Sequence, residues 1–257
     1  QRQIDDLARW KGTKSPYVFD RKKANRVCAL CEYFRHIKGP LAGERIVLEP
    51  WQVFILTTVF GWVDQHGNRR FRQVYVEVPR GNGKSALSSA VALIMLMADG
   101  EKGAEVYSLA TTADQARIVF DVSKAMARKS PDLLERVGAR VGAHAITVES
   151  ESSVFKPLAS DSSSLDGLNI HFACVDELHA HKTRDLYDVV ETALGKRLQP
   201  LLWTITTAGF DTTGICYEVR SDVIDILKGA EGGNSIFGVI YTIDAADDWT
   251  DIKAAEK

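Results

Sequence analysis

The stretch VPRGNGKSAL, at residues 78–87, restricts the possible folds of this chain more than any other. An alternating, β-branched segment precedes it at residues 73–78, and a long apolar segment follows at residues 84–98. The sequence therefore predicts a strand, a short glycine-rich loop and a buried helix in succession. In that order the loop can hold a phosphate group, because its backbone N–H groups and the N-terminus of the helix point at the same anion.

The loop departs from the common phosphate-binding pattern G-x-x-x-x-G-K-[ST]. It ends as the pattern requires, in Gly83, Lys84 and Ser85, where the lysine can reach the outer phosphates and the serine can bind Mg2+. Val78 stands where the first glycine is usual, however, and Arg80 lies within the loop. Glycine, lysine and serine meet by chance in many loops, so this stretch alone does not decide for a nucleotide. The residues expected to contact a nucleotide are Pro79, Arg80, Gly81, Asn82, Gly83, Lys84, Ser85 and Ala86.

Strand-like and helix-like segments alternate along the chain. We predict strands at residues 73–78, 104–110, 145–150, 153–159, 170–176, 200–208 and 235–243. We predict helices at residues 20–38, 49–63, 84–98, 112–128, 185–197 and 214–228. This alternation is typical of an α/β fold with a mostly parallel central sheet and helices on both faces, whose ligands bind at the carboxyl ends of the strands. The polar segment 160–167 is predicted to be a loop that moves or contacts a partner.

Two adjacent carboxylates end the apolar strand IHFACVDE. Such a pair is costly at the end of a buried strand unless it holds a cation or a water molecule. In nucleoside triphosphatases the aspartate supports the Mg2+ shell, here Asp176, and the next glutamate, here Glu177, polarises the attacking water. An ordinary acidic strand exit is the alternative, but the upstream loop and the alternating elements between them favour a nucleotide site.

Two further segments fit the same site. The strand ending TITTAG places Thr206, Thr207 and Ala208 where hydroxyl groups can contact the catalytic water or the γ-phosphate and couple hydrolysis to movement. In LEPWQ, Trp51 can pack against a base and the amide of Gln52 can pair with the edge of adenine. Threonine-rich strand ends are common, and a buried tryptophan beside a surface glutamine is an ordinary arrangement, so neither segment is decisive alone.

The composition excludes several other classes of protein. With 257 residues, 45% apolar and 26% charged, the chain has the values of a soluble globular domain. Its four cysteines are too few for a disulfide scaffold and fit a reducing, intracellular setting. Cys28 and Cys31 share an apolar helix face rather than a zinc site, and His179 and His181 lack a further ligand, which favours a structural or coupling role. The longest apolar run is too short to cross a bilayer.

The formal net charge of −2 gives no overall sign of nucleic-acid binding. Any basic surface must therefore be local, and the two candidates are residues 21–23 and residues 69–72. The ordinary alternative for both is a solvated turn or helix end.

Taken together, these segments resemble the ATPase domain of the large terminase subunit of tailed bacteriophages. The resemblance runs over most of the chain, through LEPWQ, VPRGNGKS, ATTADQAR, LDGLNIHFACVDELHAH and TITTAG. It implies a P-loop NTPase of the additional-strand, catalytic-glutamate type. In that family the first glycine of the loop is commonly missing and an arginine at the position of Arg80 contacts the phosphates or senses the nucleotide. The catalytic residues would then be Glu177, Lys84 and Arg80, and the metal ligands Ser85 and Asp176.

The resemblance also implies cofactors and partners. ATP and Mg2+ would be the cofactors, and the partners would be double-stranded DNA, the portal of the procapsid, the small terminase subunit and further copies in a pentameric ring. A monomer is expected for the isolated chain, in the host cytoplasm and without a membrane. Family members carry an RNase H-like nuclease domain as well. The expected organisation here is a helical segment at 1–48, an ATPase core at 49–243 and a linker at 244–257 toward an absent nuclease domain, so this chain is not expected to cut DNA.

The resemblance leaves one role open, that of the arginine which a neighbouring subunit donates to the nucleotide. The stretch ASDSSSLDGLN, where many terminases carry it, contains no arginine. Arg184 is preferred because it follows the catalytic carboxylates, and the other candidates are Arg197, Arg117 and Arg140. Proposed DNA contacts are Arg69, Arg70 and Arg72.

Two alternatives to a packaging motor remain. A helicase-like motor shares the same segments, but it would need a second motor lobe and would separate DNA strands. A module that binds ATP only to assemble a ring would not depend on Glu177 for turnover.

Overall fold

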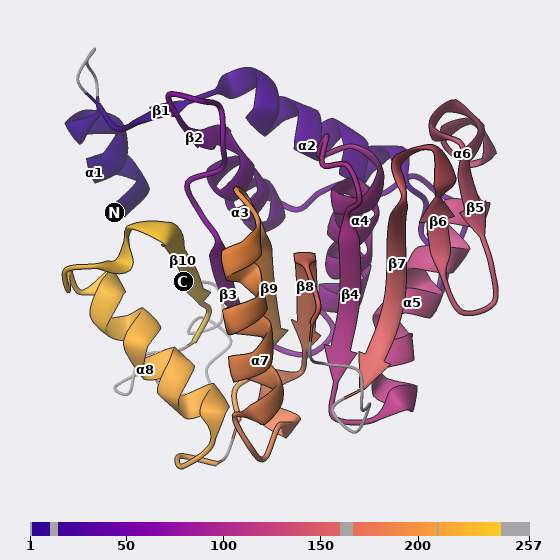
Figure 1. Ribbon diagram of the computed structural model, residues 1–257. Coiled ribbons are helices and arrows are strands. Elements are labelled where there is room, and N and C mark those ends of the chain that lie inside the picture. The colour runs from indigo at the N-terminus through magenta and orange to yellow at the C-terminus, as the bar shows by residue number, and fades with distance from the viewer. Residues whose placement is uncertain (1, 11–14, 160–166, 210, 243–257) are drawn as a thin grey trace.

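The computed structural model describes residues 2–10, 15–159, 167–209 and 211–242 (Figure 1). The α-helices are α1 (Arg2–Arg9), α2 (Arg21–Tyr33), α3 (Pro50–Gly61), α4 (Lys84–Met97), α5 (Ala113–Arg128), α6 (Pro131–Val137), α7 (Asp185–Ala193) and α8 (Ile215–Leu227). The strands are β1 (Tyr17–Phe19), β2 (Trp62–Asp64), β3 (Gln73–Glu77), β4 (Glu105–Ala110), β5 (Ala139–Val141), β6 (Ile146–Val148), β7 (Ser153–Ala159), β8 (Ile170–Asp176), β9 (Leu201–Thr206) and β10 (Ile236–Ile240). Short 3-10 turns are η1 (Glu149–Glu151), η2 (Leu178–Ala180), η3 (Leu194–Lys196) and η4 (Gly233–Ser235).

Within the described residues, eight strands form one sheet in the order β10-β3-β9-β8-β4-β7-β6-β5. The first six run parallel, and β6 and β5 extend the sheet in antiparallel fashion beyond β7. Strand β9 lies between β3, which leads into the glycine-rich loop, and β8, which ends in Asp176. This inserted strand is the mark of the additional-strand type, so the predicted α/β P-loop fold is confirmed.

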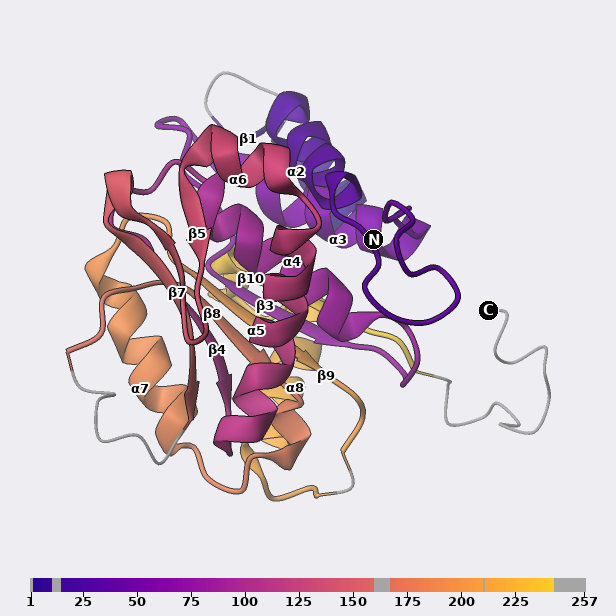
Figure 2. The same ribbon diagram turned by 90° about the vertical axis from the view of Figure 1, so that its right-hand side faces the viewer.

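Helices cover both faces of the sheet, which explains why most residues of its central strands are apolar and buried. On one face the sheet packs against α4 and α5 through Val74, Val76, Phe172 and Trp203. On the other face it packs against α7 and α8 through Tyr75, Val175 and Leu202. Figure 2 shows α5 and α7 on opposite sides of the strands. Val27 and Cys31 of α2 belong to the same core as α3 and α4, so residues 20–48 pack onto the sheet domain rather than apart from it.

Most predicted elements are present, and several are shorter than predicted. Helix α2 ends at Tyr33 because Phe34 adopts an extended backbone conformation. Helix α3 ends at Gly61, and the next residues form β2, which pairs with β1. Helix α7 ends at Ala193 and continues as the 3-10 turn η3.

The sequence patterns did not predict β1, β2, α6 and β5, and they indicated no separate helix at α1 within the helical segment predicted for residues 1–48. These elements have at most eight residues each, so their stability depends on tertiary contacts rather than on a repeated pattern. Residues 160–166 and 243–257, for which a loop and a linker were predicted, lie outside the described residues. In the described part of the chain, no helix is long and apolar enough to cross a membrane.

The basic segment 69–72 lies mostly inside the protein, so its predicted place on a DNA-binding surface is wrong. Arg69 and Arg70 are only 4% and 3% exposed. Arg69 forms an ion pair of 2.6 Å with Asp99, and Arg70 forms one of 2.7 Å with Asp6. Arg72 is half-buried, and its Nε donates a 2.8 Å hydrogen bond to the carbonyl of Arg69. These arginines stabilise the fold, because each contacts a partner inside the protein. Most of these partners lie far away in the sequence, so the segment 69–72 alone does not indicate them.

Replacing Arg70 with alanine is expected to lower the free energy of unfolding by about 3–5 kcal/mol, because it removes the ion-pair partner of the buried Asp6 carboxylate. The Arg70 guanidinium also lies 4.2 Å from the ring centroid of Trp10 and 4.6 Å from that of Phe71. Urea unfolding followed by circular dichroism measures the loss. The matched control is Arg136→Ala in α6, which removes an exposed arginine and should change the stability by less than about 0.5 kcal/mol. Equal effects of the two substitutions would contradict this role of Arg70.

Candidate nucleotide-binding site

The glycine-rich loop lies at the carboxyl edge of the sheet, between β3 and α4. Val78, which replaces the usual first glycine, still belongs to the strand ladder: its N–H donates to the carbonyl of Thr206 at 3.1 Å and its side chain is 3% exposed. A side chain is therefore accommodated in the core at this position, and the turn begins only after it.

The turn itself depends on the two later glycines. Gly81 and Gly83 have φ angles of 84° and 70°, in the left-handed region that residues with a Cβ avoid. Gly83 also caps the N-terminus of α4. The backbone N–H groups of the loop and of the first turn of α4 can therefore bind an anion at the positive end of the helix dipole.

The side chains of the loop are held by the loop itself. The Lys84 ammonium donates to the carbonyl of Pro79 at 3.3 Å, and the Asn82 amide donates to the same carbonyl at 3.1 Å. Arg80 is exposed, and among the described residues no ion-pair partner of its guanidinium is found. Lys84, although charged, is 7% exposed. A phosphate group would replace a weak carbonyl contact of this lysine with a charged one.

Residues far apart in the chain meet beside the loop. The Ser85 hydroxyl lies 3.3 Å from a carboxylate oxygen of Asp176, at the end of β8. Burial, and then the neighbouring charge of Glu177, raises the pKa of Asp176 to about 6, while Ser85 and Lys84 oppose the shift. A hydroxyl and a carboxylate are the hard oxygen ligands that suit Mg2+, and a cation there would offset the cost of a buried carboxylate. The two residues therefore fit a Mg2+ ion held jointly with phosphate oxygens.

Glu177 follows in a strained backbone conformation with φ of 53°, which is rare for a residue other than glycine. One of its carboxylate oxygens lies 3.1 Å from Nδ1 of His179 and 3.5 Å from the hydroxyl of Thr207. The same ring nitrogen lies 3.0 Å from the hydroxyl of Thr206. The end of β9 thus contacts the glutamate directly and through His179. Strain of this kind marks sites where the surroundings fix a side chain for a task.

The LEPWQ segment forms the N-terminal turn of α3 beside the loop. Gln52 is 9% exposed, and its side-chain oxygen accepts a 3.0 Å hydrogen bond from the backbone N–H of Glu49, which caps the helix. Its amide nitrogen lies 3.8 Å from the position that a Cβ of Gly83 would take. Trp51 packs edge-on against Tyr241, with ring centroids 6.1 Å apart. Gln52 therefore lies next to the glycine-rich loop with its amide nitrogen on the side of Gly83.

Residues 50–224 match the sequence model of the terminase large subunit ATPase domain, which is more than half of the chain. The chain belongs to this family. Among curated relatives, it is 26% identical over 189 residues to the terminase large subunit of Enterobacteria phage HK97, covering 72% of this chain and 36% of the relative. It is 49% identical over 92 residues to protein YmfN of Escherichia coli K12, covering 36% of this chain and 20% of the relative.

Solved structures show the same fold. The large terminase of bacteriophage HK97 aligns with a TM-score of 0.75 at 21% identity, over 90% of this chain and 46% of that one. The ATPase domain of the Thermus phage P74-26 large terminase, as an arginine mutant, aligns with a TM-score of 0.51 at 19% identity, over 75% of this chain and 81% of that one. The chain thus spans less than half of the curated relatives and of the HK97 structure.

This terminase ATPase domain contains site residues whose contacts the sequence did not indicate. His179 joins Glu177 to Thr206, and only its position two residues after the glutamate hinted at that contact. Glu77, the last residue of β3, is 2% exposed and pairs with Arg220 of α8 at 3.1 Å. In the sequence, Glu77 could have been noticed as a single carboxylate in a mostly apolar strand that leads into the glycine-rich loop.

His179 contacts Glu177, but neither it nor His181 belongs to a group of three possible metal ligands among the described residues. Burial lowers the pKa of His181, which favours its neutral form. Within the described residues, no three side chains of His, Cys, Asp or Glu lie close enough together to hold a metal ion.

Arg184, the preferred arginine for a neighbouring subunit, is half-exposed but engaged. It forms ion pairs with Asp188 at 3.2 Å and with Glu218 of α8. These two carboxylates, with the hydrogen bonds to them, raise the pKa of Arg184. To reach a nucleotide on another copy, the guanidinium would have to leave both partners.

Proposed function

We propose that this chain binds Mg2+ and ATP at the glycine-rich loop, hydrolyses the ATP, and, in the full-length protein, drives double-stranded DNA into a procapsid. The observation that carries the proposal is the 3.3 Å distance between the Ser85 hydroxyl and a carboxylate oxygen of Asp176, which lie far apart in the sequence. It brings the end of the loop and the end of β8 to one point, as a shared metal-bound triphosphate requires.

The loop residues bind the phosphates in this proposal. Backbone N–H groups between Gly81 and Ala86 surround the anion, and Lys84 leaves the Pro79 carbonyl for an outer phosphate oxygen. Arg80 is exposed in the loop. Its guanidinium stabilises the negative charge that develops as the bond to the γ-phosphate lengthens. Trp51 and Gln52 lie at the start of α3, beside the loop, and are assigned to the base.

Ser85 and Asp176 hold the cation. Mg2+ supplies neutralisation of charge on the phosphate oxygens when it is bound. The ionised form of Asp176 is the one that binds, so its raised pKa makes the ligand set most favourable above about pH 6. This proposal also explains why a carboxylate persists at 8% exposure at the end of an apolar strand.

Glu177 orients the attacking water and accepts its proton. Its contact with His179 fixes the carboxylate before the nucleotide arrives, and the Thr207 hydroxyl adds a second contact. Thr206 touches the same histidine from β9. When the γ-phosphate leaves, a change at Glu177 is therefore passed to the end of β9 through His179. This assigns the coupling role to Thr206, Thr207 and the following Ala208.

The wider assembly is proposed from the family alone. A pentameric ring, the portal, the small terminase subunit and the host cytoplasm are its expected setting, with no membrane, and DNA cutting belongs to a nuclease domain of the full-length protein. Arg184 stays the proposed trans-acting arginine, since it lies on the same edge as Glu177 and its present partners are on the surface.

The proposal is tested by phosphate release from ATP in the presence of Mg2+, with and without double-stranded DNA. Turnover is expected to require Mg2+, to disappear when EDTA removes the metal, and to rise when DNA is added. Turnover that persists in EDTA would contradict the role of Ser85 and Asp176. Strand separation of a duplex with a single-stranded tail would favour the helicase alternative. Binding of ATP with ring formation and no phosphate release would favour the assembly module.

A further inference from the structure

Charge is distributed unevenly in this protein. Between residues 21 and 48 the sequence has seven Lys or Arg residues and two Glu residues, in a chain whose formal net charge is −2. This segment therefore carries a formal charge of about +5 and the rest of the chain is acidic. It contains α2 and the loop that leads to α3.

The cations of α2 are available, unlike those of residues 69–72. Arg21, Lys22, Lys23 and Arg26 are all exposed in the first two turns of the helix. Within the described residues, none of the four forms an ion pair, whereas Arg69 and Arg70 each do. The four lie on one helix within six positions, and no acidic residue separates them. A surface of this kind attracts a polyanion.

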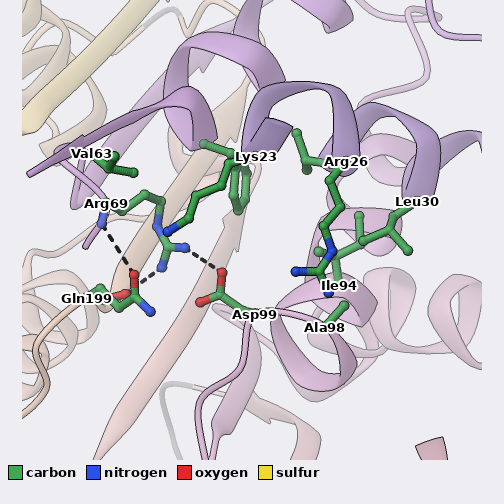
Figure 3. Close-up of a pocket in the computed structure, with 11 residues that line it drawn as sticks. Lys23, Arg26, Leu30, Val63, Arg69, Ile94, Ala98, Asp99 and Gln199 are labelled. Carbon is green, nitrogen blue, oxygen red and sulfur yellow. Dashed lines mark hydrogen bonds and ion pairs between the residues drawn. The ribbon is translucent and has the colours of Figure 1, made fainter. Parts of the chain in front are cut away.

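Two of these cations border a pocket between α2, α3 and the C-terminal end of α4. Lys23 and Arg26 extend from α2 toward the pocket, and Asp99 and Arg69 lie across from them (Figure 3). The ammonium of Lys23 donates to the carbonyl of Gly67, which holds the side chain in place. The pocket has a volume of about 80 Å3, while sites for small organic ligands have roughly 300–1,000 Å3. It can therefore take a single charged group of a larger molecule rather than a whole nucleotide.

The single carboxylate of the pocket is already neutralised. One oxygen of Asp99 is paired with Arg69 at 2.6 Å and the other lies 2.8 Å from Nε2 of His171. Burial alone would raise the pKa of Asp99, but Arg69 and His171 hold it well below the usual range. Arg69 thus neutralises the charge of Asp99. Within the described residues, Lys23 and Arg26 have no carboxylate paired with them at this pocket.

We propose that the exposed face of α2, with Arg21, Lys22, Lys23 and Arg26, is a binding surface for the phosphate backbone of double-stranded DNA, and that the pocket beside Lys23 and Arg26 receives one phosphate. The proposal names the DNA contact of the proposed motor and so builds on that function. The surface lies at the amino edge of the sheet, whereas the nucleotide site lies at the carboxyl edge; in Figure 1, α2 is at the top and the strands point downward. DNA and ATP would therefore bind at opposite edges of the sheet.

The test is DNA binding by the Lys23→Ala, Arg26→Ala double variant of the 257-residue chain. Fluorescence anisotropy of an end-labelled DNA duplex is recorded between about 0.05 and 0.2 M salt, the range over which phosphate contacts lose most affinity. Loss of two cations that each form an ion pair with the DNA backbone is expected to reduce the slope of log K against log salt by about 1.8 and to weaken binding on the order of 50-fold at ~0.1 M salt. The matched control is Lys156→Ala, Lys228→Ala, which removes two exposed lysines elsewhere and should leave the slope nearly unchanged.

Several outcomes would overturn the proposal. It fails if the two double variants weaken binding equally, if the α2 variant binds as the unaltered chain does, or if the unaltered chain binds no duplex at the lowest salt. Each variant must unfold at the same temperature as the unaltered chain. If the double variant is unstable, the single variant Arg26→Ala replaces it, with half the expected change in slope. ATP turnover without DNA should persist in the α2 variants. If salt-dependent DNA binding through α2 is found but no ATP turnover, the proposed hydrolysis fails and the DNA surface stands.

Discussion

Substitution of Glu177 by glutamine is expected to lower ATP turnover by about 1,000-fold and to leave nucleotide affinity nearly unchanged. The amide keeps the size of the side chain but cannot accept the proton of the attacking water, and general-base catalysis contributes roughly 100- to 10,000-fold to such reactions. Affinity is preserved because the glutamate is assigned to the water, while the loop and α4 bind the phosphates. Steady-state phosphate release and binding of a fluorescent ATP analogue measure the two quantities separately.

Glu135→Gln is the matched control for this substitution. Glu135 is an exposed glutamate of α6, so the same chemical change there should leave turnover as it is. Turnover in Glu177→Gln within about twofold of the unaltered chain would remove Glu177 from the catalytic role. A large loss of affinity instead of turnover would place the residue among the binding groups.

Lys84→Ala is expected to reduce both nucleotide affinity and turnover, with turnover lowered by about 100-fold or more. The ammonium is 7% exposed and donates to the Pro79 carbonyl, so it already lies within the loop, and alanine removes its positive charge from the proposed phosphate site. Removal of one preorganised donor from a transition state typically lowers a rate by about 100- to 1,000-fold. Isothermal titration with ATP and Mg2+, together with phosphate release, records the joint loss.

Two variants complete that experiment. Lys129→Ala removes an exposed lysine that follows α5 and should behave as the unaltered chain. Lys84→Arg keeps the charge but enlarges the head group within the loop, and it should recover some binding without restoring full turnover. Equal turnover in Lys84→Ala and the unaltered chain would mean that this loop is not the hydrolytic site.

The sequence predicted the parts of the site that depend on short segments. The strand, loop and helix around Lys84 follow from local pattern, and the end of β8 follows from two carboxylates after an apolar run. The insertion of β9 between β3 and β8 followed only from the family resemblance, because strand order depends on pairing across the whole sheet. The chemistry of the site could thus be predicted, while its spatial order needed the structure.

Contacts between distant residues account for what could not be predicted. Arg70 pairs with Asp6, 64 positions away, and Arg69 pairs with Asp99, 30 positions away. Nothing in the segment RRFR indicates that its charges are buried. Buried arginines are stable only when they pair with carboxylates, and here these carboxylates come from distant parts of the sequence. The contact of His179 with Thr206 has the same origin, because it joins two different strand ends.

Helix α4 connects the glycine-rich loop with the pocket beside α2. It begins at Lys84, in the phosphate loop, and Ile94 near its end lines the pocket under α2. A helix of 14 residues is about 21 Å long and resists bending. A tilt of its first turn would therefore be carried along the rigid helix to the residues that line this pocket. One rigid helix thus joins the glycine-rich loop to the pocket beside α2.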